Sequence, residues 1–216
     1  MEARIERVWT PRVAEQDTGT PTVAVEANTW IIGDDEEVIV IDPGEDAAGV
    51  LERVGDREIL AVICTHGHAS HVAAALEVAE RDEAPVALHP ADRLHWRAAH
   101  AVDEPEIDMA DGGRFDVADV ALEVIETPGH TYGSVSLYCE DLEVVFTGDA
   151  LLASGPAPHD GEFPDFPGQL TAIGERLLTL PTQTRVLPGH GEESSIGFAS
   201  KRFDSWVAAG PSADLD

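Results

Sequence analysis

Basic residues are scarce in this chain. Lysine and arginine together number 13 against 42 aspartates and glutamates, the net charge is −29, and Lys201 is the only lysine. An acidic excess of this size repels nucleic-acid phosphates and anionic membranes unless a basic patch intervenes, and the sequence contains no such patch. We therefore expect a solvated acidic surface and a small-molecule substrate, with neither nucleic acid nor membrane as a partner.

Cysteines and long apolar runs are scarce as well. Cys64 and Cys139 are the only cysteines, and each lies in an apolar run, which favours two buried side chains over a disulfide or a nucleophile. No run of about 18 apolar residues occurs, as a membrane-spanning helix would need, and residues 1–7 do not begin a signal peptide. These absences predict a soluble, unexported protein of the reducing cytoplasm.

The apolar runs that are present predict a layered α/β fold. Hydrophobic residues make up 43% of the 216 residues, which is enough for a single domain over residues 1–216 with a substantial core. Successive strand-like runs first pair locally and then alternate with helix-like segments, as in α/β layered domains. The expected strands cover 22–32, 38–41, 59–64, 85–88, two runs within 115–127, 135–138, 144–146 and 185–187; the expected helices cover 46–54, 72–79, 91–100, 168–180 and 194–209, and the expected loops 103–113 and 156–167.

Three histidines follow the apolar run 59–64 within six residues. His66 and His68 alternate as strand residues do, so both imidazoles can point to the same side of the chain, and His71 falls in the first turn of the helix expected next. Neutral imidazoles bind zinc at about 2.0–2.1 Å, usually with three or four protein ligands. The pattern therefore predicts a metal site at the end of a buried strand.

Three later strands also end in residues that can bind a metal. His130 follows a Thr-Pro-Gly turn, Asp149 follows a Thr-Gly turn, and His190 follows a Pro-Gly turn. One such ending is often only a turn or cap residue, but four strand ends of this kind indicate one metal site. A surface or cap role is expected for His89, His95 and His100, each of which lacks a partner two residues away.

Together these motifs resemble the metallo-β-lactamase superfamily over nearly the whole chain, from Asp42-Pro43-Gly44 to Pro188-Gly189-His190. The resemblance implies an αββα four-layer sandwich, in which two packed mixed β-sheets are flanked by helices and metals lie on loops at one edge. Within the superfamily, segments 127–131, 146–151 and 188–191 are most similar to glyoxalase II-like thioester hydrolases. The implied ligands are His66, His68 and His130 for the first metal, Asp149 as a bridge, and His71 and His190 for the second metal.

Ser70 departs from the pattern of the superfamily, which usually reads His-x-His-x-Asp-His. The missing carboxylate normally ligates the second metal and helps to orient the attacking hydroxide, whereas a serine hydroxyl is a poor ligand with no base function near pH 7. Ser70 is expected to cap the helix that begins near His71. We count Ser70 with Asp149 among the candidate catalytic residues and expect a weakened second metal site.

The resemblance leads to three alternatives for function. The first is a hydrolase of a thioester or related ester that holds one or two zinc ions, with Asp149 bridging a second metal or orienting a hydroxide formed near pH 7. The second is similar to the persulfide dioxygenases, with one iron bound by His66, His130 and Asp149, but it leaves the other candidate ligands without a role. The third is a metal-binding paralogue in which Ser70 impairs catalysis. The charge disfavours nucleases, and the missing signal peptide disfavours a secreted β-lactamase.

The substrate and its thiol carrier are not specified by these motifs. The loop 155–168 is a candidate lid, and Phe163, Phe166 and Tyr132 could line a pocket, although core packing explains each of them equally well. An exposed apolar patch on this loop could also support a homodimer.

Overall fold

Two packed β-sheets form the centre of the protein in this computed structural model, which describes residues 2–10, 27–157 and 165–210. The strands of the N-terminal sheet are β1 (Arg4–Thr10), β2 (Ala27–Gly33), β3 (Glu37–Ile41), β4 (Glu58–Ile63), β5 (Val86–Leu88) and β6 (Ile107–Asp108). Those of the C-terminal sheet are β7 (Arg114–Val117), β8 (Val120–Glu126), β9 (Val135–Cys139), β10 (Val144–Gly148), β11 (Arg185–Pro188) and β12 (Ser194–Ser195). Each sheet is mixed and follows chain order across its width, with parallel pairs from β3 to β6 and at β10–β11.

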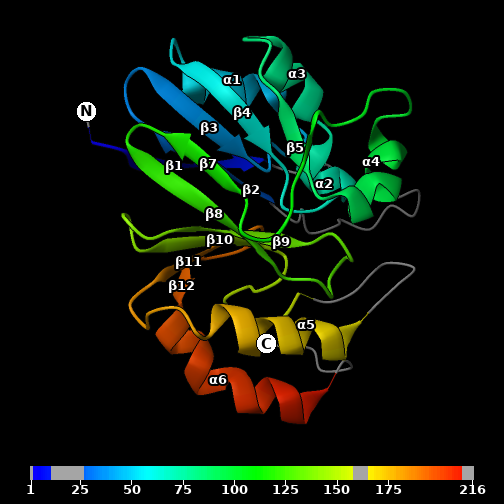
Figure 1. The fold of residues 1–216 in the computed structure, drawn as a ribbon, viewed down its shortest axis with the longest axis vertical. Helices are drawn as coiled ribbons and strands as arrows, with labels where there is room; N and C mark the ends of the chain where they lie inside the picture. The colour runs from blue at the N-terminus through cyan, green and yellow to red at the C-terminus, as the bar shows by residue number, and fades with distance from the viewer. Residues whose placement is uncertain (1, 11–26, 158–164, 211–216) are drawn as a thin grey trace, which may run out of the picture.

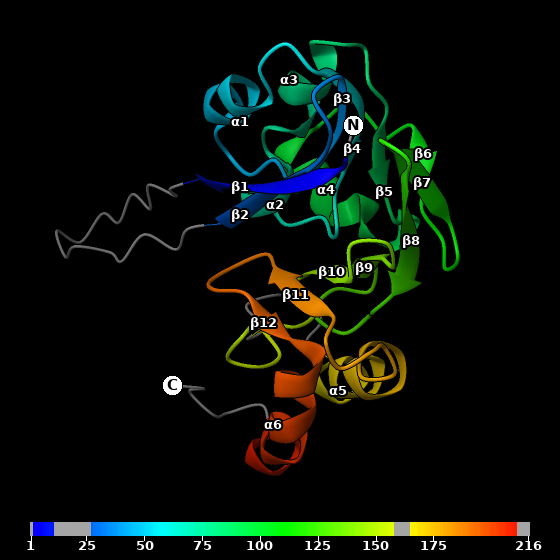
Figure 2. The ribbon, with the colours of Figure 1, turned by 90° about the vertical axis from the view of Figure 1, so that its left-hand side faces the viewer.

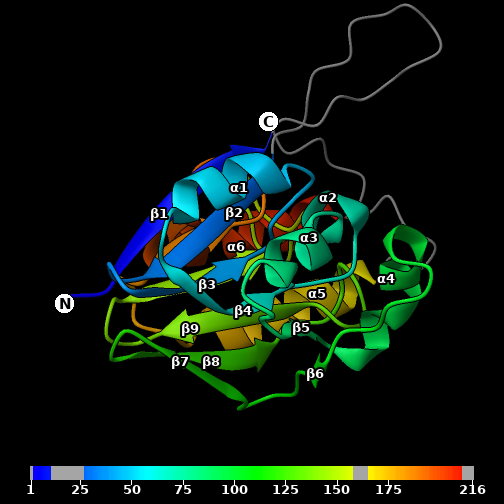
Figure 3. The ribbon, with the colours of Figure 1, turned by 90° about the horizontal axis from the view of Figure 1, so that it is seen from above.

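Helices cover the outer faces of both sheets (Figures 1 and 2). The N-terminal sheet is covered by α1 (Ala47–Val54), α2 (Ala69–Val72), α3 (Ala75–Glu80) and α4 (Arg93–Ala99), which follows the short 3-10 turn η1 (Pro90–Asp92). Figure 3 shows α1, α2 and α3 lying over this sheet. The C-terminal sheet is covered by α5 (Phe166–Ala172), which continues into the π-helical turn η2 (Ile173–Leu177), and by α6 (Ile196–Ala209). The layers are therefore those of the expected αββα sandwich.

Apolar side chains fill the spaces between these layers. Because strand residues alternate between the two faces of a sheet, Val40 of β3 packs against the helices while its neighbour Ile41 packs between the sheets. In β10, Val145 faces the C-terminal helices and Phe146 faces the other sheet. Burial on both faces explains why these strands read as nearly continuous apolar runs in the sequence.

Side-chain caps fix the starts of three helices. Asp46 accepts a hydrogen bond from the Gly49 amide at the start of α1, at 3.0 Å. Asp165 and Ser195 accept the corresponding bonds at the starts of α5 and α6, at 2.9 and 3.1 Å. Each cap satisfies a backbone donor that the first helical turn leaves unpaired. The helices expected over 46–54, 168–180 and 194–209 thus begin close to their capping residues.

Several elements differ from the sequence-based expectation. The strand β1 was not expected, because arginines and glutamates interrupt its apolar pattern, and the two-residue strands β6 and β12 are too short to give a pattern. The helix expected over 72–79 is two helices, since the Ala74 amide donates to Gly44 O at 2.8 Å and so leaves the helical ladder. Residues 22–26 of the first expected strand lie outside the described residues.

Both cysteines are free and buried, as expected. In the part of the chain that the structure describes, no helix has the length and apolar character needed to cross a membrane.

Candidate metal centre

The loop that follows β4 brings three histidines together. His66 and His71 are fully buried and His68 is half-buried. The ring centroid of His66 lies 4.8 Å from that of His68 and 4.3 Å from that of His71. The buried strand β4 anchors one end of this loop and α2 turns the chain back, so all three imidazoles come from one short segment.

The C-terminal sheet contributes three further side chains. His130 lies in the loop between β8 and β9, Asp149 follows β10, and His190 follows β11. Because β10 and β11 run parallel, their carboxyl ends meet at the same edge of the sheet. His130 and Asp149 are buried, and His190 is half-buried.

Asp149 lies among four of these imidazoles. Its Oδ2 atom is 3.9 Å from His66 Nε2 and 3.6 Å from His71 Nε2. The same oxygen is 3.5 Å from His130 Nε2 and 3.5 Å from His190 Nε2. One carboxylate oxygen is thus within reach of histidines from both sheets, which is the position that a ligand shared between two ions requires.

The donor atoms form two groups that suit metal ions. Within the groups, His68 Nδ1 lies 3.1 Å from His130 Nε2, and His71 Nε2 lies 3.2 Å from His190 Nε2. Two nitrogens that share one tetrahedral zinc at about 2.0–2.1 Å are roughly 3.3 Å apart, so these separations fit a common ion. In each group the ligand atoms lie within 4.8 Å of one another; the first group is His66, His68 and His130, and the second is His71, Asp149 and His190.

Two buried polar atoms point to the same conclusion. The Nε2 atom of His66 and the Oδ1 atom of Asp149 have no hydrogen-bond partner among the described residues. A buried polar atom without a partner is costly, and a bound cation would satisfy both atoms. The residues present therefore fit a metal ion or a pair of ions.

In the metal-free protein, electrostatics favour the protonation states that bind a metal at His66 and Asp149. Burial lowers the pKa of His66 well below its usual value, so this imidazole is neutral. Burial disfavours a charge on His71, but Asp149 and Asp42 raise the pKa of His71 to about 10. Burial likewise disfavours a charged Asp149, yet His71 and the neighbouring imidazoles hold the pKa of this carboxyl well below its usual value. Binding of a metal to His71 must therefore displace a proton.

Asp42 orients the histidine loop from the end of β3. Its carboxylate accepts hydrogen bonds from the amide and the hydroxyl of Thr65, both at 2.7 Å, and lies 3.2 Å from His71 Nδ1. Asp42 could itself join His66 and His71 in a ligand group, but these bonds already occupy both of its oxygens. It therefore turns the Nε2 atom of His71 toward the second group. In the sequence, Asp42 stands out only as the first residue of the Asp42-Pro43-Gly44 motif.

Asp92, in η1, was missed entirely. Its carboxylate is fully buried and accepts hydrogen bonds from the amides of Gly67 and Gly133, at 2.8 and 2.7 Å, and from the hydroxyl of Thr131, at 2.7 Å. Gly67 belongs to the loop of His66 and His68, whereas the other two donors belong to the loop of His130. Asp92 thus ties together the two loops that form the first ligand group. One aspartate among 42 acidic residues gives no sequence signal of such a role.

Ser70 does not cap a helix. The helix Ala69–Val72 has His68 at its N-cap, so Ser70 lies inside it and the expected cap is wrong. The side chain of Ser70 is half-buried. By contrast, His89 accepts a bond from the amide of residue 91 at the start of η1, at 3.3 Å, so the cap role expected there is confirmed. The Nε2 atom of His100 lies 2.8 Å from the carbonyl oxygen of residue 72.

His95 and the aromatic residues expected near a pocket differ in their burial. His95, expected at the surface, is half-buried and packs against His68 with ring centroids 5.1 Å apart, so it borders the first ligand group. Tyr132 is 58% exposed, and Phe166 is half-buried at the start of α5. Phe163 and part of the expected lid lie outside the described residues, so the lid stays a prediction.

Comparisons with known proteins identify the family of this fold. A family model described as the metallo-beta-lactamase superfamily matches residues 23–190. The Probable metallo-hydrolase YqgX of Bacillus subtilis is 31% identical over 191 residues, which cover 82% of this chain and 90% of that protein. The hydroxyacylglutathione hydrolase GloC of Haemophilus influenzae is 27% identical, with coverage of 82% and 91%. A solved structure of TTHA1623 in a di-iron-bound form has a TM-score of 0.74 at 28% identity, with coverage of 82% and 93%.

Proposed function

The chain belongs to the metallo-β-lactamase superfamily, and from this we propose that it is a zinc-dependent hydrolase of a thioester or related ester of a small molecule. The observation that carries the proposal is the convergence of imidazoles from two sheets on the carboxylate of Asp149. Similarity to the hydroxyacylglutathione hydrolase of Haemophilus influenzae supports a thioester as the substrate.

Two groups of residues would hold the ions. The first ion would be bound by His66, His68 and His130, and the second by His71 and His190, with Asp149 shared between them. When bound, zinc supplies a Lewis acid for a carbonyl group and a hydroxide nucleophile near neutral pH.

The side chains around the ions position the reacting groups. The Oδ1 atom of Asp149 is buried and has no hydrogen-bond partner among the described residues, so it can accept a hydrogen bond from a water molecule and orient it. Asp42 keeps His71 in the orientation that binds a metal, and Asp92 holds the loops of the first group at a fixed separation. At Ser70 the usual second carboxylate is missing, so we expect a weaker second ion and slower turnover.

An iron enzyme similar to the persulfide dioxygenases is the second candidate. The atoms of His66, His130 and Asp149 lie close enough for a facial triad, with nitrogens 3.9 and 3.5 Å from the carboxylate oxygen. This assignment does not need a carboxylate at position 70. It leaves the close approach of His71 to His190 unexplained, and for that reason we favour the hydrolase.

Metal analysis combined with a thioester assay tests the proposal. Protein purified without added metal is analysed for zinc and iron and assayed with a hydroxyacylglutathione and with a simple acyl thioester. We expect zinc and hydrolysis in the native protein. We also expect a loss of turnover of roughly 100-fold or more in Asp149→Asn, because even changes next to metal ligands cost about 10–100-fold.

The matched control is His89→Asn, which removes a histidine of neither ligand group and keeps a side-chain acceptor for the cap of η1. This variant should keep both its zinc and its activity. About one iron per chain with no thioester hydrolysis would overturn the proposal and would support the iron enzyme.

A further inference from the structure

The turn that carries His190 is held by the N-terminal sheet. The backbone amide of Asn28, in β2, donates to Gly189 O at 2.7 Å. The side-chain amide of Asn28 donates to Pro188 O at 2.9 Å and to Gly191 O at 3.0 Å. Three carbonyl groups on either side of His190 therefore accept bonds from one buried asparagine of the opposite sheet.

Arg7, in β1, completes this arrangement. Its Nε atom donates to Asn28 Oδ1 and one terminal nitrogen donates to Gly191 O, both at 2.9 Å. The guanidinium also lies 4.7 Å from the ring centroid of Trp9 and 5.6 Å from that of Trp30, which restricts its position. The bond from Arg7 fixes the amide of Asn28 with its oxygen toward the arginine and its two donors toward the turn.

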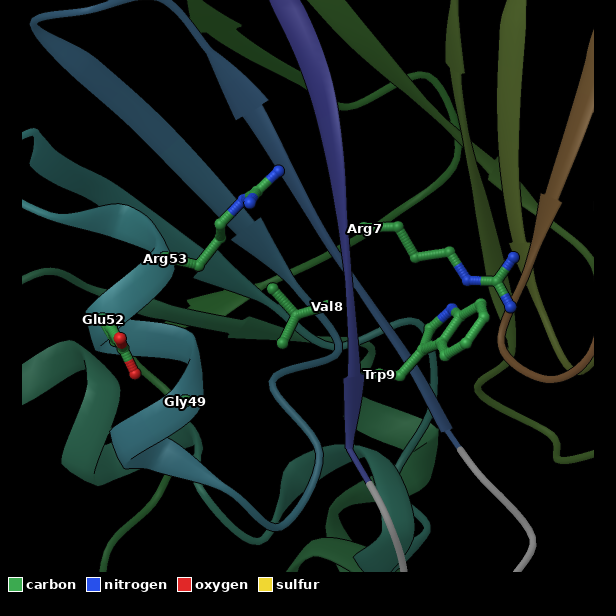
Figure 4. Close-up of a pocket in the computed structure, with 6 residues that line it drawn as sticks. All are labelled: Arg7, Val8, Trp9, Gly49, Glu52 and Arg53. Carbon is green, nitrogen blue, oxygen red and sulfur yellow. The ribbon is translucent and has the colours of Figure 1, made fainter.

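Figure 4 shows how the side chains of Arg7, Val8 and Trp9 leave β1. A surface pocket of about 590 Å³ lies between β1 and α1, and it is lined by Arg7, Val8, Trp9, Gly49, Glu52 and Arg53. Arg7 extends to the other side of the strand, toward the C-terminal sheet (Figure 4). Its side chain is only 18% exposed, so its guanidinium is largely committed to the contacts with the turn.

His190 depends on such support more than the buried ligands do. Its side chain is 18% exposed, whereas those of His71 and His130 are 0% and 4% exposed. The turn also contains Gly191, at a φ of +72°. Because glycine has no Cβ, it restricts the backbone of the turn little. Asn28 and Arg7 supply most of the hydrogen bonds from the N-terminal sheet to this turn, and the indole of Trp30 adds one to Pro188 O at 3.0 Å.

We propose that Arg7 and Asn28 are positioning residues that determine the affinity of the second metal site through His190. The proposal rests on the metal centre proposed above. The proposal also deepens the proposed function, because Ser70 supplies no carboxylate and the second ion is left with His71, Asp149 and His190. Groups that orient metal ligands typically contribute about 10–100-fold in affinity, and we expect an effect of this size on the second ion alone.

Zinc titration with a chromophoric chelator as competitor tests this without any enzymatic readout. The metal-free native protein should take up two zinc ions with distinct affinities. In Arg7→Ala and in Asn28→Ala, the weaker binding step should be lost or weakened about 10–100-fold, while the tighter step should stay unchanged. Arg7→Lys keeps a charged donor near Gly191 O and should recover part of the loss.

Arg4→Ala is the matched control. Arg4 lies on the same strand as Arg7, but its ion pairs are with Glu6 and Asp35 and not with the turn of His190. This variant should bind zinc as the native protein does. Unchanged binding of both ions in Arg7→Ala and Asn28→Ala would overturn the proposal, and so would native protein that binds a single ion. Two ions with no thioester hydrolysis would instead refute the proposed function and leave the positioning role intact.

Discussion

Asp92→Ala is the substitution whose effect the structure defines most closely. The carboxylate accepts three buried hydrogen bonds of 2.7–2.8 Å, from two backbone amides and one hydroxyl. Leaving a buried donor without a partner costs about 1–3 kcal/mol, and removing one partner from a buried charged network costs about 3–5 kcal/mol. We expect the free energy of unfolding to fall by roughly 3–5 kcal/mol, which corresponds to a decrease in Tm on the order of 10 °C.

Urea and thermal unfolding in the presence of a chelator measure this loss without any contribution from bound metal. Asp92→Asn should lose less, because its amide oxygen can still accept one bond, although its NH₂ group must face donors. Asp108→Asn is the control: its side chain is 54% exposed and pairs with Arg93 at 2.6 Å, a surface contact worth about 0–1 kcal/mol. The reasoning fails if Asp92→Ala is no more destabilising than Asp108→Asn.

Thiol labelling, substitution at Ser70 and chelation provide further tests. Burial, with a contribution from the charge of Asp42, raises the pKa of the Cys64 thiol well above its usual value, so an alkylating reagent near pH 8 should label Cys64 in urea and not in the folded protein. Ser70→Asp should raise both zinc occupancy and thioester turnover; unchanged values of both would show that Ser70 does not limit the second site. Removal of metal should lower the Tm, because an ion at 1,000 times its Kd stabilises the folded protein by about 4 kcal/mol.

The sequence predicts most of the central strands because their side chains are buried on both faces of the sheet. Strands such as β3, β4 and β10 read as continuous apolar runs, and each ends in a turn that contains glycine. The six candidate ligands could be listed for the same reason, since they follow buried strands in a spacing that resembles one superfamily. Their mutual distances come only from the structure, because they depend on how two sheets pack.

The residues that support the ligands could not be found in the sequence. Arg7 and Asp92 are charged residues in a chain rich in charge, and Asn28 is one polar residue in an apolar strand. Their roles depend on contacts with segments far away in the sequence, such as the bond from Arg7 to Gly191, which spans 184 residues. Local patterns carry no information about such contacts.

Core packing between the sheets links the two halves of the metal centre. Each ligand group takes residues from the loop after β4 and from the C-terminal sheet, so the separation of the sheets sets the distances between ligands. Trp30 and Phe146 pack edge to face between the sheets, with ring centroids 6.1 Å apart. The indole of Trp30 also donates to Pro188 O at 3.0 Å, and Phe146 lies three residues before Asp149. Because a close-packed core transmits strain, we expect a change in this aromatic pair to alter the spacing of ligands that it does not touch.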